Sequence, residues 1–200
     1  TEIATRQGVE KRLANLQTAY SRFVPPQLVE LLGKESILDV DWGNQAEKKM
    51  TILFSDIHGF ASLSERMSPQ QCFDFINAYL SFMEPVVLAH GGFIDKYIGD
   101  SVMALFPSRG DDALHASLGM LAELNNFNAQ RSILLSELPG DHPERRGGSD
   151  IRIGIGLNSG LLMLGVIGGS NRMEVTVISD AVNLASRVEK RDDKIGNSAL

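Results

Sequence analysis

The sequence predicts an α+β domain with a ferredoxin-like βαββαβ core, preceded by a helical lead-in. Apolar runs of strand length alternate with longer segments whose apolar residues recur every three or four positions. The elements follow one another in the order β-α-β-β-α-β-β-β-α, and the first six are those of a split βαβ unit. The 200 residues suffice for one domain with a sizeable core plus an appendage.

Residues 1–48 are predicted to be a helical linker from an upstream module. The apolar residues of 9–23 are spaced as in an amphipathic helix: Val9, Leu13, Leu16, Tyr20 and Phe23. Pro25 and Pro26 end this helix, and a short second helix follows before Gly33. The first helix has two interpretations of similar weight, a coiled-coil seam or a cap on the core of its own domain.

The domain proper spans residues 49–200 and begins with a strand over 50–55. A long helix follows up to about Ala89, with Ser68 as N-cap and Pro69 at its first position. Pro85 predicts a kink or an early end, and Gly91 and Gly92 terminate the helix. The stripe expected to be buried comprises Phe73, Ile76, Tyr79, Leu80, Met83 and Val87.

Strands over 93–98 and 101–106 are joined by a tight turn at Gly99 and Asp100. The remaining expected elements are a helix over 111–131, a loop over 136–149, strands over 151–157 and 161–166 turning at 158–160, a strand over 175–178, and a helix over 180–190. Asp180 is the expected N-cap of the last helix.

Composition narrows the class of protein. A net charge of −6 disfavours a nucleic-acid partner, because phosphate binding requires a basic surface. The single cysteine, Cys72, excludes an internal disulfide and indicates a reducing, cytoplasmic compartment. No membrane span or signal peptide is expected. The start at Thr1 and the incomplete last element indicate a piece of a longer protein, and that parent protein could be membrane-attached.

Two aspartates carry the strongest chemical signal. Asp56 ends an apolar strand, and Asp100 lies in the turn between two others. Buried carboxylates are costly unless they are paired or bind metal, so the pair favours a site for Mg²⁺ or Mn²⁺ over two separate turn residues. Gly59 permits close backbone approach, so the amides up to Phe60 can face phosphate oxygens.

Three further side chains have a functional and a structural interpretation each. By strict alternation Lys96 shares a face with Ile94 and Ile98, either as a donor to a base edge or as a snorkelling lysine. Asn183 and Arg187 lie one helical turn apart, either to bind phosphoryl charge or as a solvated helix face with Arg187 paired to an acid.

Gly154 and Gly156 lie in a strand, where glycine permits close packing or a bulge.

Three segments together resemble the class III nucleotidyl cyclase catalytic domain. They read FSDIHGF over 54–60, FIDKYIGD over 93–100 and TVISDAVNLASR over 176–187. The resemblance covers about residues 45–190, with all segments in order. The lead-in over 22–33 is similar to the segment that precedes such domains in bacterial multidomain cyclases.

The resemblance implies conversion of ATP to 3′,5′-cyclic AMP and pyrophosphate by two Mg²⁺ or Mn²⁺ ions. Asp56 and Asp100 would hold the ions with the Ile57 carbonyl. Asn183 would orient the ribose, and Arg187 would stabilise charge at the α-phosphoryl group. In this family the metal residues of one subunit face the base-reading residues of the other, which implies a homodimer with shared sites.

The resemblance also bears on substrate choice. Base selection in the family rests on two positions, here Lys96 and Thr176, and this combination resembles the adenylate-selective pattern. A lysine donor suits the N1 acceptor of adenine, whereas guanine presents donors there. Some members bind the distal phosphates with an arginine where this chain has Gly154. Arg152 is the expected substitute, and the last strands of the family's fold are expected to be missing.

Three alternatives remain open. The chain could be a guanylate cyclase, which Lys96 disfavours. It could be an inactive cyclase-homology domain that only dimerises or senses nucleotide, against which the complete residue set counts. A metal-dependent nucleotidyltransferase with a palm-like sheet is disfavoured by the acidic surface and by the third segment.

Overall fold

The computed structural model describes residues 2–137, 150–169 and 171–196, which form two compact units. The N-terminal unit comprises Thr1–Lys48 and Met163–Ile178, and the main unit comprises Lys49–Leu162 and Ser179–Leu200. Most of the loop expected over 136–149 lies outside the described residues.

The N-terminal unit contains helices α1 (Glu2–Tyr20) and α2 (Pro26–Leu31) and the 3₁₀ turn η1 (Ile37–Asp39). Its hairpin is formed by the end of strand β4 (Ile153–Gly169), which pairs antiparallel with β5 (Arg172–Ile178). A small core joins α2, η1 and the hairpin through Val29, Val40 and Val166. The apolar stripe of α1 is not part of that core, since Val9, Leu13 and Leu16 are all more than half exposed.

The main unit is built on strands in the order β2-β3-β1-β4. Strand β3 (Ser101–Phe106) lies between β1 (Gln45–Ile57) and β2 (Phe93–Ile98) and is antiparallel to both. This order, with helices between the first and second and between the third and fourth strands, is the expected ferredoxin-like arrangement. The prediction of an α+β fold is confirmed.

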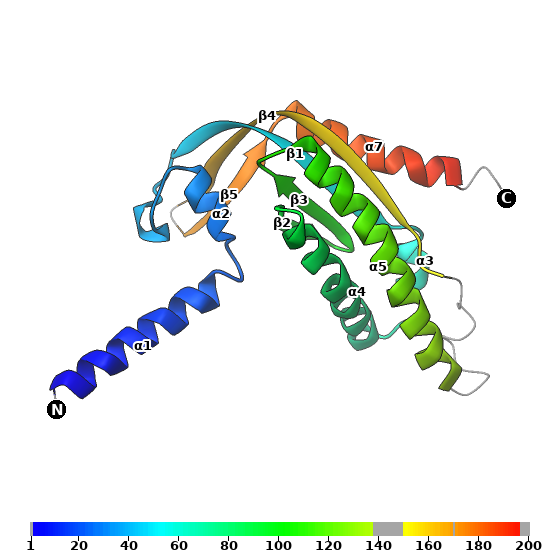
Figure 1. Ribbon diagram of the computed structural model, residues 1–200, viewed down its shortest axis with the longest axis horizontal. Coiled ribbons are helices and arrows are strands. Elements are labelled where there is room, and N and C mark those ends of the chain that lie inside the picture. Colours follow the sequence, from blue (N-terminus) through cyan, green and yellow to red (C-terminus); the bar gives the residue numbers. More distant parts are fainter. Residues whose placement is uncertain (1, 138–149, 170, 197–200) are drawn as a thin grey trace. The chain divides into compact units, whose positions relative to one another are not determined.

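Helices α4 (Pro69–Ala89) and α5 (Gly110–Glu137) lie side by side over the sheet (Figure 1). They enclose the main core with the strand residues that face them, including Leu53, Ala104 and Phe106. The predicted helix start is confirmed, because Ser68 and Gln71 form a reciprocal capping box. Its end is confirmed as well: Gly91 adopts a left-handed conformation that few side chains tolerate. Of the predicted stripe, Tyr79, Met83 and Val87 are buried, Ile76 and Leu80 are partly buried, and Phe73 is exposed.

Helix α7 (Asp180–Gly196) packs on the opposite face of β4. Odd-numbered residues of β4, Ile153 and Ile155, belong to the core under α4 and α5. A Cβ on the alternate residues Gly154 and Gly156 would meet Glu189 and the backbone of α7. The interpretation of these glycines as close-packing residues is therefore confirmed, because the helix backbone occupies the space that a side chain would need.

Several local predictions were wrong. The turn expected at 158–160 does not form, because β4 runs without a break; the Asn158 side chain instead donates to the Ala181 carbonyl, 3.0 Å away. Of the two outcomes predicted for Pro85, a kink or an early end, the early end does not occur, because α4 continues to Ala89. Helix α5 extends past Arg131 to Glu137. The last helix is capped by Ser179 rather than Asp180, since the Ser179 hydroxyl accepts from the Ala181 amide at 2.8 Å.

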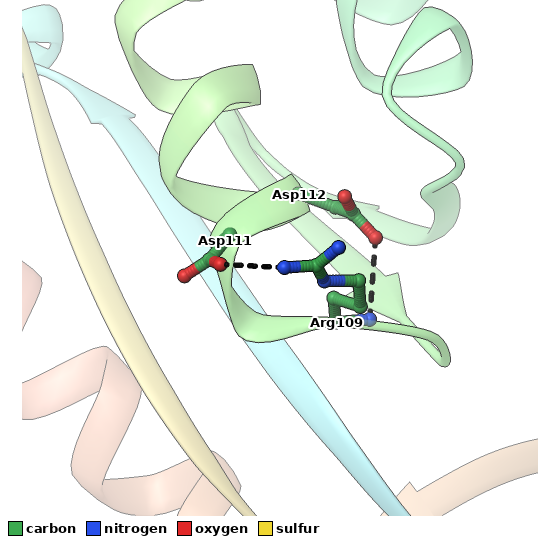
Figure 2. A network of polar contacts seen from close by, with 3 residues as sticks. All are labelled: Arg109, Asp111 and Asp112. Atoms are coloured by element: carbon green, nitrogen blue, oxygen red, sulfur yellow. Dashed lines mark hydrogen bonds and ion pairs between the residues drawn. The ribbon is translucent and has the colours of Figure 1, made fainter.

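The start of α5 is organised by Arg109 and two acidic residues of the first helical turn (Figure 2). Asp112 accepts from the Arg109 amide at 3.2 Å, and Asp111 forms an ion pair with the Arg109 guanidinium, also at 3.2 Å. Acidic side chains at this end of a helix interact favourably with its dipole. The Arg109–Asp111 pair is exposed and therefore contributes little stability.

Among the described helices, α4 alone is long and apolar enough to cross a membrane by length and composition. The sequence analysis predicted no apolar segment long enough to span a membrane. Because Tyr79, Met83 and Val87 of this helix are buried against protein, length and composition are weak grounds for a membrane span here.

Candidate active site

The two predicted aspartates lie together at one end of the sheet. The Ile57 amide is 3.2 Å from Asp56 Oδ1 and also 3.2 Å from Asp100 Oδ2. The Ser101 hydroxyl donates to Asp56 Oδ1 at 2.8 Å. The end of β1 and the β2–β3 turn thus hold two carboxylates around a single amide, as the topology predicted.

The proximity of these carboxylates changes their chemistry. The pKa of Asp100 is raised from 3.8 to about 7, first by burial and then by its hydrogen bond and charge repulsion with Asp56. Burial also raises the pKa of the Tyr79 phenol to about 12, and the charges of Asp100 and Asp56 add to this. The surroundings of the two carboxylates therefore disfavour further negative charge, and a bound cation would reduce the repulsion between them.

The donor set suits a hard divalent cation. Asp56, Asp100 and the Ile57 carbonyl offer only oxygen atoms, which Mg²⁺ and Mn²⁺ prefer. Over the described ranges there is no cluster of three or more His, Cys, Asp or Glu side chains arranged to hold a metal. The two-carboxylate set fits an ion that completes its coordination with substrate oxygens and water.

The segment that follows Ile57 turns sharply into a short helix, α3 (Phe60–Ser64). Gly59 precedes it with φ of 69°, a left-handed conformation that favours glycine. The Phe60 ring stacks on Phe75 of α4, with centroids 6.2 Å apart, so Phe60 packs inward. Gly59 and Phe60 accordingly fix the path of the backbone beside the two carboxylates.

Lys96 lies on the same face of the sheet as Asp56. Strict alternation predicted that Lys96 shares a face with both Ile94 and Ile98; this is correct for Ile98 and wrong for Ile94. Ile94 pairs with Ala104, whereas Lys96 pairs with Met103, so Asp95 is an extra residue that forms a β-bulge. Since residues paired across an antiparallel ladder share a face, Lys96 and Ile94 lie on opposite faces. Lys96 shares its face with Ile98 and Ser101, away from the core that contains Ile94.

Asn183 and Arg187 are both exposed on α7, which packs on that same face of the sheet. In the described part of the chain, Arg187 makes no ion pair with Glu189 or Asp180, the partners considered for a solvated helix face. Glu189 instead points inward, is 5 % exposed and lies beside Gly154. The two predicted transition-state residues therefore project from the surface, and neither bonds to Asp56 or Asp100 of the same chain as described.

The other two predicted residues lie elsewhere. Thr176 belongs to β5 of the N-terminal unit, is buried at 7 % exposure and pairs with Gly165. Arg152 has an exposed side chain just before β4, and its carbonyl accepts from the His58 amide at 2.9 Å. Arg152 is thus tied through its backbone to the loop after Asp56.

The sequence analysis did not predict two residues that lie next to the predicted site residues. Ser101 orients Asp56, and Asp95 forms an ion pair with Lys96. Ser101 could have been found, because it opens the strand directly after Asp100, and the neighbouring antiparallel strand β1 ends just after Asp56. Asp95 gave no separate signal, since its role depends on the bulge.

A cavity of about 590 Å³ lies between α4 and α5 and is lined mainly by apolar side chains, including Phe75, Phe82 and Phe127. None of the predicted site residues lines it. The polar groups described above lie instead at the strand ends and on the opposite face of the sheet.

Comparisons with a family model and with known proteins identify the same protein family. The family model described as "Adenylate and Guanylate cyclase catalytic domain" matches residues 43–195. An adenylate cyclase of Anabaena cylindrica is 38 % identical over 190 residues, which cover 94 % of this chain and 36 % of that protein. A terminal-differentiation-specific adenylate cyclase of Dictyostelium discoideum is 38 % identical over 180 residues, 90 % of this chain and 8 % of that protein.

Among solved structures, a bacterial light-regulated adenylyl cyclase superposes with a TM-score of 0.72 at 28 % identity. The superposition covers 95 % of this chain and 52 % of that one. The chain therefore spans only about half or less of the length of these relatives.

Proposed function

The chain belongs to the adenylate and guanylate cyclase catalytic domain family, and we propose that it is an adenylate cyclase module that converts ATP to 3′,5′-cyclic AMP and pyrophosphate. The observation that carries the proposal is the pair of carboxylates, Asp56 and Asp100, around the Ile57 amide. Lys96 lies on the same face of the sheet as Asp56. The adenylate cyclases at 38 % identity support the same activity.

Asp56, Asp100 and the Ile57 carbonyl would hold two divalent cations, Mg²⁺ or Mn²⁺. When bound, such ions neutralise triphosphate charge and lower the pKa of the attacking ribose 3′-hydroxyl. The oxygen of that hydroxyl forms a bond to the α-phosphorus, its proton passes to solvent water, and the bond from the α-phosphorus to the bridging oxygen breaks so that pyrophosphate leaves in line. The Ser101 hydroxyl keeps Asp56 oriented through its 2.8 Å hydrogen bond.

Asn183 and Arg187 act at the reacting phosphoryl group of the ATP that is bound to the carboxylates of a neighbouring subunit. Both side chains are exposed on α7 and make no bond to the carboxylates of their own chain as described, which suits residues that complete a site across a homodimer interface. Asn183 orients the ribose, and the Arg187 guanidinium stabilises the charge that develops on the α-phosphoryl oxygens. A monomer is therefore inactive.

Lys96 and Thr176 select the base. The Lys96 ammonium donates to adenine N1, and the Thr176 hydroxyl accepts from the exocyclic amine. The N1–H and N2–H₂ donors of guanine would face the Lys96 ammonium with the wrong polarity, so GTP is the poorer substrate. Arg152 contacts the distal phosphates; the exposure of its side chain and the hydrogen bond from the His58 amide to its carbonyl support this role.

The residues before the main unit connect it to an upstream sensory or regulatory domain in a longer cytoplasmic or membrane-attached protein. The exposed apolar stripe of α1, formed by Val9, Leu13 and Leu16, supports a coiled-coil connection between two chains.

The test is formation of cyclic nucleotide from ATP and from GTP, each with Mg²⁺ and with Mn²⁺. The 200-residue chain and a version extended beyond Leu200 are compared, with dimer formation checked by sedimentation. Cyclic AMP in excess over cyclic GMP is the expected result. Dimers that form neither product would overturn the proposed activity in favour of a domain that only binds nucleotide or dimerises.

A further inference from the structure

Asp95 is a carboxylate in an unusual place for its residue type. It is the extra residue of the β2 bulge, and its side chain is fully buried, with 0 % of it exposed. Removing a carboxylate from water is costly unless a counter-charge accompanies it. A bulge that needed only a spacer would not require a charged residue here.

The counter-charge is the neighbouring ammonium. Lys96 Nζ lies 3.6 Å from Asp95 Oδ2, and the Lys96 side chain is 28 % exposed. A lysine without such a partner extends its ammonium into water along its flexible stem. The ion pair with a fixed, buried carboxylate instead holds the Lys96 head group close to the strand.

The same residue also determines which way Lys96 faces. If Asp95 were paired regularly, with no bulge, alternation would place Lys96 on the face of Ile94, which packs against the core. The bulge places it with Ser101, whose hydroxyl binds Asp56. Asp95 thus supplies both the change of face and the charge that anchors the side chain.

From this geometry we infer that Asp95 is a positioning residue for base recognition: it holds the Lys96 ammonium where an adenine edge can accept from it. The inference rests on the proposed function, because it assigns Asp95 to the nucleotide selectivity of that site. A positioned ammonium favours ATP, whereas a mobile one contacts either base through water. Loss of the anchor therefore weakens ATP binding more than it slows turnover.

The main test compares Asp95→Asn with the wild-type chain. This variant keeps the shape of the side chain and removes its charge. We expect KM for ATP to rise about tenfold, kcat at saturating ATP to fall by less than about threefold, and the preference for ATP over GTP to drop about tenfold. Asp111→Asn, which removes the charge of an exposed ion pair, is the matched control and should leave all three values unchanged.

A binding measurement separates this inference from the proposed activity. Calorimetric titration with 3′-deoxy-ATP and 3′-deoxy-GTP, which lack the attacking hydroxyl, reports base preference without any reaction. Product from the wild-type chain with an unchanged ATP preference in folded Asp95→Asn overturns the role of Asp95 alone. A wild-type chain that makes no cyclic product but shows an Asp95-dependent preference in binding overturns the activity alone. Failure to bind either analogue overturns both.

A second variant covers the outcome in which Asp95→Asn does not fold. Asp95→Glu keeps the charge and shifts it by one methylene, so we expect ATP preference to fall about threefold with the fold retained. If Asp95→Glu is folded and as selective as the wild type, the position of the carboxylate does not matter and the inference is wrong.

Discussion

Replacing Asp100 with asparagine should make the metal-free protein more stable while abolishing its activity. The structure raises the pKa of Asp100 from 3.8 to about 7, chiefly through burial and the nearby Asp56. The folded chain therefore keeps the Asp100 proton up to about pH 7, whereas the unfolded chain releases it near pH 4. Because the folded state binds more protons in this window, stability falls as pH rises through it.

The size of the effect follows from the shift. At 1.36 kcal/mol per pH unit, a shift from 3.8 to about 7 corresponds to at most about 4 kcal/mol. Asp100 is only half-buried and solvent screens its charge, so we expect about 1–2 kcal/mol above pH 7. For a chain of 200 residues this is a melting-temperature change of about 3–6 °C. Asparagine carries no charge at any pH, and its amide can still donate to Asp56.

The assay is thermal unfolding at pH 4 and pH 8 in EDTA, for the wild type, Asp100→Asn and Asp111→Asn. Asp100→Asn should melt higher than the wild type at pH 8, with a smaller difference at pH 4. The exposed Asp111→Asn control should show no such dependence. At pH 8, Mn²⁺ added in excess over EDTA should stabilise the wild type and not Asp100→Asn. If Asp100→Asn melts below the wild type, and by the same amount at pH 8 as at pH 4, the explanation by repulsion between Asp100 and Asp56 is refuted.

Three other predictions concern selectivity and packing. Lys96→Glu should reduce the ATP-to-GTP activity ratio at least about tenfold, because the acid accepts from guanine and repels the adenine acceptor; an unchanged ratio in steady-state assays would remove Lys96 from base recognition. Gly156→Ala should destabilise the main unit by about 1–3 kcal/mol, because its Cβ would overlap the backbone of α7 at Ala185. Chemical denaturation tests this against Gly169→Ala, which has open space, and equal effects would contradict the packing argument. Ser68→Ala should cost about 1 kcal/mol through loss of the α4 capping box, and denaturation curves that coincide with the wild type would rule out that contribution.

The sequence predicted the core of the fold because its signals are local. Ser68 with Pro69 marks a helix start, Gly91 marks its end, and the apolar strands flank Asp56 and Asp100 on both sides. The meeting of the two aspartates followed from strand order alone. These features depend on residue type and spacing, which can be read without knowledge of tertiary contacts.

The features that escaped prediction depend on contacts between distant segments. Asn158 and Gly160 look like a turn, but Asn158 bonds to α7 and Gly160 lies against Ala181, so the strand continues. The bulge at Asp95 cannot be inferred from alternation, because it is defined by pairing with Met103 and Ala104. The exposure of Asn183 and Arg187 likewise follows from which face of α7 packs on β4.

The central claim is that the carboxylates of one chain and Arg187 of another form a single cyclase site. It is tested most directly by mixing Asp56→Ala with Arg187→Ala, each inactive alone, and measuring cyclic AMP formed from ATP. Random pairing makes half of the dimers mixed, each with one intact site, so we expect about a quarter of wild-type activity per subunit. No recovery in a mixture shown by native mass spectrometry to contain heterodimers would contradict the claim.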